Sequence, residues 1–134
     1  MTDSRFEAGA KFSDQDIAEI ESVLGRKIPV DYQKFVKHYG GAFVGGAVDG
    51  ADDLPILDFF NPGKAGGIID VLNWYEDLRD DRILPIARDE LGNLYVQNVH
   101  GSIYYINYYG GTTSAREIAN NFSDFISRIV VDDE

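Results

Sequence analysis

The sequence predicts an α+β fold in which helices flank a mostly antiparallel sheet of about five strands. Three observations predict this class: apolar residues recur at helical spacing near both ends of the chain, short β-like runs fill the middle, and no regular strand–helix alternation occurs. With 134 residues, of which 44% are hydrophobic, we expect a single domain over residues 1–134, with its core between 14 and 130.

Two helices are expected first. Ser13 can cap a helix with Asp16 in a capping-box position, and Gly25 suits the helix end. Pro29 suits the first turn of the second helix, which Gly40 and Gly41 end. The apolar positions at helical spacing are Ile17, Ile20 and Leu24 in the first helix, and Tyr32, Phe35, Val36 and Tyr39 in the second.

The middle of the chain favours strands over residues 42–48 and 55–60, with Pro55 at an edge or a strand start. A third helix is expected over residues 68–78. Three strands follow at residues 83–87, 94–99 and 103–108, and Pro85 marks the first as an edge or bulged strand. Gly92 suits a turn between the first two of them.

A last helix is predicted from a capping box formed by Ser114 and Glu117. Its apolar face comprises Ile118, Phe122, Phe125, Ile126 and Ile129. The expected element order is therefore α-α-β-β-α-β-β-β-α.

The residue inventory argues against catalysis. The chain has no cysteine and two histidines, of which His38 falls near a helix end and His100 in a tight turn. Adjacent carboxylates such as Asp89 and Glu90 point apart in a turn, and the acids near Asp49 do not follow a calcium-loop spacing. We therefore expect no enzyme activity, no cofactor and no metal.

The net charge of −11 disfavours nucleic acid and anionic membranes as partners and favours a basic protein. No apolar signal segment or membrane-spanning run is evident, and the lack of cysteine suits a reducing compartment. We expect a cytoplasmic protein.

The order of short motifs resembles the SUKH superfamily, also known as the Smi/Knr-type domain, over residues 14–130. The matching residues are Leu24-Gly25, Ile28-Pro29, Asp31-Tyr32, Phe35-Val36, Tyr39-Gly40-Gly41, Leu84-Pro85-Ile86-Ala87, Asp89, Gly92-Asn93, Tyr95, Ile103-Tyr104-Tyr105, Ile118-Ala119, Phe122 and Asp124-Phe125-Ile126.

The resemblance implies a bacterial immunity protein that binds and neutralises a cognate toxin, often a nuclease, by direct contact. The candidate contact residues are Asp49, Asp52, Asp53, Asp58, Phe59, Phe60, Asp89, Glu90, Tyr108 and Tyr109. At least one of Phe59 and Phe60 could be exposed, because neighbouring strand residues face opposite sides.

Two other functions stay open. One is a regulatory scaffold of the same superfamily, and the other is a ligand sensor with a cleft near Trp74 and Tyr75. For Trp74 we favour ordinary helix packing over a place in a cleft.

Overall fold

The structure is a computed structural model that describes residues 5–49, 54–62, 66–108 and 114–131. Its helices are α1 (Asp14–Leu24), α2 (Val30–His38), α3 (Ile68–Trp74), α4 (Glu76–Asp80) and α5 (Phe122–Ser127). Its strands are β1 (Phe43–Val48), β2 (Leu54–Phe59), β3 (Leu84–Arg88), β4 (Leu94–Gln97), β5 (Ile103–Asn107), β6 (Ser114–Ala119) and β7 (Ile129–Val130).

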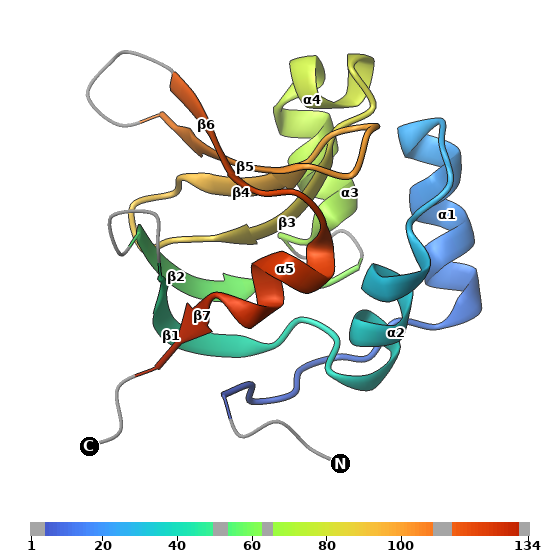
Figure 1. The fold of residues 1–134 in the computed structure, drawn as a ribbon. Helices are drawn as coiled ribbons and strands as arrows, with labels where there is room; N and C mark the ends of the chain where they lie inside the picture. Colours follow the sequence, from blue (N-terminus) through green and yellow to red (C-terminus); the bar gives the residue numbers. More distant parts are fainter. Residues whose placement is uncertain (1–4, 50–53, 63–65, 109–113, 132–134) are drawn as a thin grey trace.

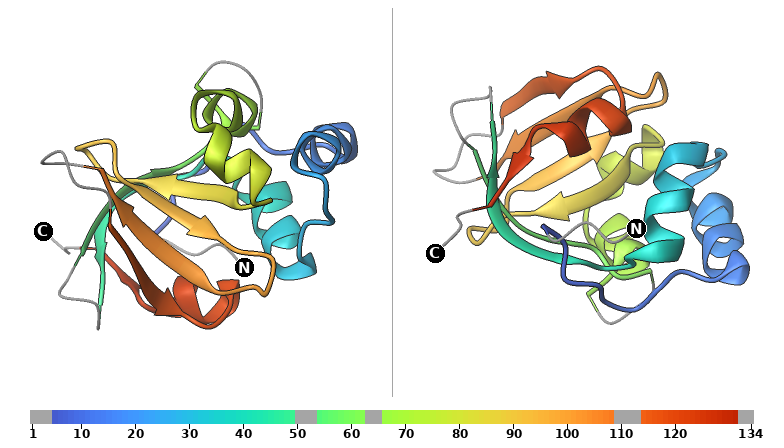
Figure 2. Two further views of the ribbon diagram at one scale, coloured as in Figure 1. Left: turned by 90° about the horizontal axis from the view of Figure 1, so that it is seen from above. Right: turned by 60° about the horizontal axis from the view of Figure 1, so that its bottom comes forward.

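The strands form one antiparallel sheet in the order β6-β5-β4-β3-β2-β1-β7. The sheet is strongly curled, and α5 connects its two end strands, β6 and β7 (Figures 1 and 2). Helices α3 and α4 lie on the other side of the sheet from α5 (Figure 2). Helix α1 contacts α3 and α4, whereas α2 contacts α5. The α+β class and the antiparallel sheet are thus confirmed.

The predicted caps of the first helix are present. The Ser13 side chain accepts a hydrogen bond from the Asp16 amide at 3.0 Å, and the Asp16 carboxylate accepts one from the Ser13 amide at 2.9 Å. Gly25 ends the helix with a φ of 78°, in the left-handed region that glycine adopts without strain. Local sequence therefore sets both ends of α1.

The predicted strand number and element order are wrong at the C-terminus. Residues 114–119 are strand β6 and not the start of the last helix, so the Ser114–Glu117 capping box does not form. This segment pairs with β5 from Ile103↔Ala119 to Asn107↔Ser114. Pairing with β5 satisfies backbone groups along the segment, and this tertiary contact overrides its local helical pattern.

The last helix starts later than predicted. Helix α5 begins at Phe122, where the Asn121 side chain accepts a hydrogen bond from the Asp124 amide at 2.8 Å. After it, the short strand β7 pairs with β1 through Val130↔Ala47. With β6 and β7, the sheet has 7 strands in the described part of the chain instead of about five.

The third predicted helix is divided at Tyr75. This residue has φ −114° and ψ 80°, outside the helical region, so α3 ends before it and α4 begins after it. The Tyr75 amide still donates to the Val71 carbonyl at 2.9 Å, and the Tyr75 carbonyl accepts from the Leu78 amide at 3.0 Å. The break redirects the chain between two short helices.

Strand β3 lies inside the sheet, between β2 and β4, so the edge alternative for Pro85 is wrong and the bulge alternative is confirmed. The register against β4 shifts between Pro85 and Ala87. Strand β2 reaches only the far end of β3, through Asp58↔Arg88 and Phe59↔Ala87. No β2 pairing is therefore lost at the proline, which lacks an amide hydrogen.

Aromatic rings fill the space between the sheet, α2 and α5. The Phe35 and Phe59 ring centroids lie 4.7 Å apart, and Phe59 also contacts Phe125 at 6.3 Å. Tyr95 of β4 packs on Phe125 at 5.4 Å. Burial of these rings removes a large apolar area from water and so contributes to the stability of the fold.

Candidate functional site

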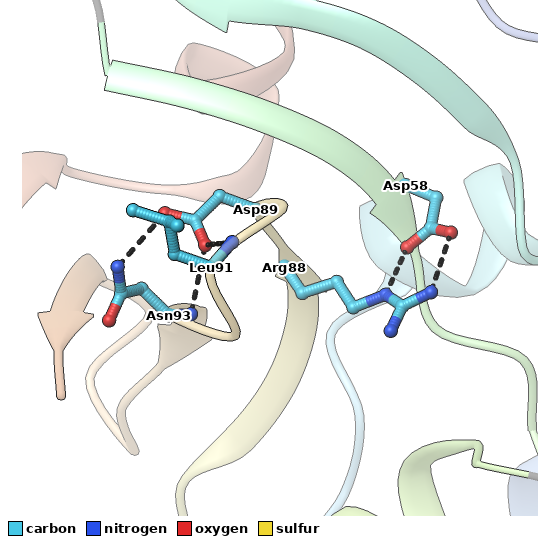
Figure 3. A network of polar contacts seen from close by, with 5 residues as sticks. All are labelled: Asp58, Arg88, Asp89, Leu91 and Asn93. Carbon is cyan, nitrogen blue, oxygen red and sulfur yellow. Dashed lines mark hydrogen bonds and ion pairs between the residues drawn. The ribbon is translucent and has the colours of Figure 1, made fainter. Parts of the chain in front are cut away.

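The turn between β3 and β4 is built around the buried carboxylate of Asp89, whose residue is only 2% exposed. One carboxylate oxygen accepts hydrogen bonds from the amides of Leu91 and Asn93, both at 2.9 Å. The other accepts from the Asn93 side-chain amide at 3.1 Å (Figure 3). It also accepts from the Tyr105 hydroxyl at 2.6 Å. Four donors thus replace the water that burial removes.

This turn also fixes the end of strand β5. The side-chain oxygen of Asn93 accepts a hydrogen bond from the Tyr108 amide at 2.7 Å. Tyr105, on β5, is held by Asp89. The two contacts therefore hold Tyr108 at a set distance from the β3–β4 turn.

Tyr108 packs against the helix break at Tyr75. The two ring centroids are 5.0 Å apart, and the ring planes are inclined by 31°. Burial raises the pKa of the Tyr108 hydroxyl, and Tyr75 and the Asp77 carboxylate raise it further. The Asp77 carboxylate therefore contributes negative electrostatic potential at the Tyr108 hydroxyl.

Next to this pair, Trp74 is 66% exposed, so the preference for helix packing was wrong. The sequence held a signal for this exposure, because Trp74 lies off the helical spacing of Ile68, Val71 and Leu72, which are buried in α3. Its neighbours line a hollow of about 280 Å³. We call this the aromatic hollow, and its lining residues are Trp74, Tyr75, Glu76, Asp77, Leu78 and Tyr108.

A second hollow of about 180 Å³ shares Trp74 and Tyr75 with the aromatic hollow and is also lined by Gly92 and Leu94, at the end of the β3–β4 turn. A third, of about 190 Å³, follows at Asp58 and shares Phe60, Gly66 and Arg88 with the second. The three hollows form one concave surface, which we call the Trp74 surface. It runs from the ion pair on β2 and β3 to the end of β5.

The ion pair at one end joins neighbouring strands. The Arg88 guanidinium donates to both carboxylate oxygens of Asp58, at 2.8 and 3.2 Å (Figure 3). The hydrogen bond to Asp58 raises the pKa of Arg88. Because both groups are partly exposed, the pair adds little to stability but presents a fixed charge pair on the surface.

Comparison with protein-family models identifies the family of the chain. The model of the SMI1 / KNR4 family (SUKH-1) covers residues 11–128. The chain belongs to the SUKH-1 family. No curated protein matches the chain.

The motif residues that carried the resemblance hold the SUKH-1 domain together. Asp89, Asn93 and Tyr105 form the buried network of the turn. Gly40 has a φ of +65°, and a Cβ there would lie 2.0 Å from the Ala10 carbonyl oxygen. Another residue at this position would push the N-terminal segment away from α2.

The link between α1 and α2 is likewise structural in this SUKH-1 chain. Arg26 donates to the carbonyls of Arg82 at 2.7 Å and Gln97 at 3.0 Å. These bonds join the α1–α2 link to the open end of the β3–β4 hairpin, where Leu84 pairs with Gln97. Burial lowers the pKa of Arg26.

Some of the predicted contact residues are in the protein interior. Phe59 is 3% exposed and Phe60 is 6% exposed, so neither of the two phenylalanines is on the surface. Both carboxylate oxygens of Asp89 accept hydrogen bonds inside the protein, so this side chain does not face a partner. Their contribution to a partner surface would therefore be indirect, through the shape of the turn and of the Trp74 surface.

Other predicted contact residues are accessible. Asp49 and Glu90 are exposed, and Asp58 and Tyr108 are half-buried. Asp49 lies at one end of the β1–β2 hairpin and Asp58 at the other, so the structure does not bring this acidic pair together. Asp52, Asp53 and Tyr109 lie outside the described residues.

In residues 5–49, 54–62, 66–108 and 114–131, no group of three or more His, Cys, Asp or Glu side chains could hold a metal ion. His38 and His100 are exposed and lie on separate elements. No helix in the same ranges is long and apolar enough to cross a membrane.

Proposed function

We propose that this protein is an immunity protein that neutralises a cognate bacterial toxin domain by direct contact. Membership of the SUKH-1 family is consistent with this function. The observation that carries the proposal for this chain is the Trp74 surface, where a 66% exposed tryptophan lies among concave hollows. Tryptophan and tyrosine are the residues most enriched at binding hot spots.

The charge of the chain supports a basic partner. The net charge is −11, and the rim of the Trp74 surface carries Glu76, Asp77, Asp58 and, on the β3–β4 turn, the exposed Glu90. A negative field steers a positively charged protein into encounter and opposes the binding of nucleic acid. A basic nuclease domain fits this surface, because its own phosphate-binding groove is positively charged.

The division of the Trp74 surface into several small hollows favours a protein partner over a small ligand. Pockets for small molecules usually enclose about 300–1,000 Å³. The hollows of the Trp74 surface measure about 180, 190 and 280 Å³, and they lie side by side. A further hollow of about 440 Å³ is lined by residues between 18 and 27 at the end of α1, so it is a surface depression beside one segment.

We propose binding without catalysis, at the Trp74 surface, in the cytoplasm. The contacts would come from Trp74, Tyr108, Asp58 and Glu90, together with the acids of the aromatic hollow. Asp49, Asp52 and Asp53 would form a separate acidic contact at the β1–β2 turn. A regulatory scaffold is the alternative within the same superfamily, and it would engage a host protein in place of a toxin.

Co-expression with the toxin domain encoded beside the gene tests the function. We expect growth rescue and a stoichiometric complex for the wild type. Trp74→Ala should weaken the complex at least tenfold, because truncation of a central hot-spot residue commonly costs about 2 kcal/mol or more.

The matched control is Val30→Ala. Val30 is also 66% exposed but lies at the start of α2. Equal loss of binding in both variants would show that the contact is not centred on Trp74. Failure of the wild-type protein to form a complex would contradict the proposed function itself.

A further inference from the structure

The aromatic hollow has an unusual combination of side chains for an exposed site. Three aromatic residues line it, and the two carboxylates of Glu76 and Asp77 lie beside them. The faces of aromatic rings attract cations, and tryptophan does so most strongly. A site with both features has the chemistry of a cation-binding cage.

The aromatic residues of the hollow are accessible to solvent. Trp74 is 66% exposed, and Tyr75 and Tyr108 are only partly buried. The 5.0 Å contact between the two tyrosines orders one wall of the hollow. The hydrogen bond from the Tyr108 amide to Asn93 anchors that wall to the β3–β4 turn. The wall is therefore preorganised, which lowers the entropic cost of binding.

The carboxylates lack a counter-ion within the described residues. Asp58 pairs with Arg88 and Asp14 pairs with Lys37, whereas neither Glu76 nor Asp77 forms an ion pair there. Arg79 is close in sequence but donates to the Asn73 side chain at 3.4 Å instead. Asp77 lines the hollow together with Tyr108, whose pKa is raised by burial and further by Tyr75 and the Asp77 carboxylate.

We propose that the aromatic hollow receives an arginine side chain of the partner protein, stacked on Trp74 and facing Glu76 and Asp77. This inference rests on the proposed function for the source of the arginine. The volume of about 280 Å³ accommodates the end of a single side chain. Arginine fits better than lysine, because its planar, weakly hydrated guanidinium stacks on rings and forks to carboxylates.

Trp74 is the single tryptophan of the sequence, so its fluorescence reports on the hollow directly. The test is a titration of the full chain with L-argininamide at constant ionic strength. L-citrullinamide, with a neutral urea group in place of the guanidinium, is the matched probe. We expect a saturable fluorescence change with argininamide at an apparent affinity about fivefold or more above that of citrullinamide.

Two double variants locate the effect. Glu76→Gln/Asp77→Asn removes the carboxylates of the hollow, and Asp80→Asn/Asp81→Asn makes the same charge change outside its lining. The first should abolish the preference for argininamide, and the second should keep it. Circular dichroism of both variants checks that α4 is retained, because acids in a first helical turn also stabilise the helix.

Two results would overturn the inference: equal responses to the two amides, or equal loss of the preference in both double variants. The same variants then separate this inference from the proposed function. If the Glu76→Gln/Asp77→Asn variant binds the toxin with unchanged affinity, the proposed function is supported and the arginine site is contradicted. If argininamide binds but no toxin complex forms, the cation site in the hollow is supported. The proposed function is then contradicted, and with it the toxin as the source of the arginine.

Discussion

The hydroxyl of Tyr105 donates a hydrogen bond of 2.6 Å to the buried carboxylate of Asp89. This contact ties strand β5 to the β3–β4 turn, and Asn93 extends the connection to the amide of Tyr108. Tyr108 in turn forms a wall of the aromatic hollow. A network in the interior thus sets the shape of the surface that we propose for binding.

Removal of that hydroxyl should destabilise the domain. Tyr105→Phe leaves a buried carboxylate with one donor fewer, and we expect the free energy of unfolding to fall by about 1.5–3 kcal/mol, since the bond involves a charged acceptor. Urea unfolding measures it. The neighbouring Tyr104 points to the opposite face of the strand, so Tyr104→Phe should cost less than about 0.5 kcal/mol. Equal losses in the two variants would contradict the role of this hydrogen bond.

The stability of the domain should fall at alkaline pH. Burial and the hydrogen bond to Asp89 raise the pKa of Tyr105 from 10.0 to about 12, and burial also raises the pKa values of Tyr32 and Tyr95. Above pH 10 the unfolded chain loses these protons while the folded chain keeps them. Stability is therefore fully present below pH 10 and is lost as the pH rises toward 12.

The contribution of Tyr105 to this pH dependence can be isolated. Tyr105→Phe should flatten the decrease between pH 10 and 12, measured by chemical unfolding at each pH, because the variant has one fewer shifted group. A variant with the same slope as the wild type would show that the Tyr105 pKa is not raised in the folded state.

The revised C-terminal region gives a paired test of helix capping. Asn121→Ala removes the side chain that accepts from the Asp124 amide, and it should lower the unfolding free energy by about 1 kcal/mol. Ser114→Ala should be near neutral, within about 0.5 kcal/mol, because Ser114 is exposed on strand β6. A larger loss for Ser114→Ala than for Asn121→Ala would instead support the capping box that the sequence predicted at Ser114.

Electrostatic steering predicts how the partner associates. Asp77→Lys should slow association about threefold to tenfold at low salt, and the difference should shrink as salt rises. Glu7→Lys makes the same change in net charge next to β1, at a residue that does not line the Trp74 surface, and should slow association less. Stopped-flow kinetics across ionic strengths measures both rates. Identical rates for the two variants would place the contact elsewhere.

The sequence predicted the elements whose signals are local. The caps of α1 at Ser13 and Gly25 are where the pattern placed them, and so is the turn at Gly92, whose φ is +87°. Strand β6 was missed because its assignment depends on pairing with β5, a contact that no local pattern encodes. Tertiary pairing decided the structure of that segment.

The site was predicted less well than the fold, for a similar reason. Tyr108, one of the predicted contact residues, is half-buried and lines the aromatic hollow. Trp74 was assigned to packing, although it lies off the helical spacing of the buried residues of α3 and is exposed. Asp89 looked like a surface acid of a turn, and only the fold shows that four donors enclose it. Burial is a property of the assembled sheet.

Binding of the cognate toxin domain tests the central claim most directly. The measurement is the dissociation constant between the purified protein and the toxin domain encoded beside its gene, together with growth of cells that express both. We predict a stoichiometric complex, growth rescue, and a loss of at least tenfold in affinity for Trp74→Ala but not for Val30→Ala. The absence of both a complex and rescue with the wild-type protein would contradict the account.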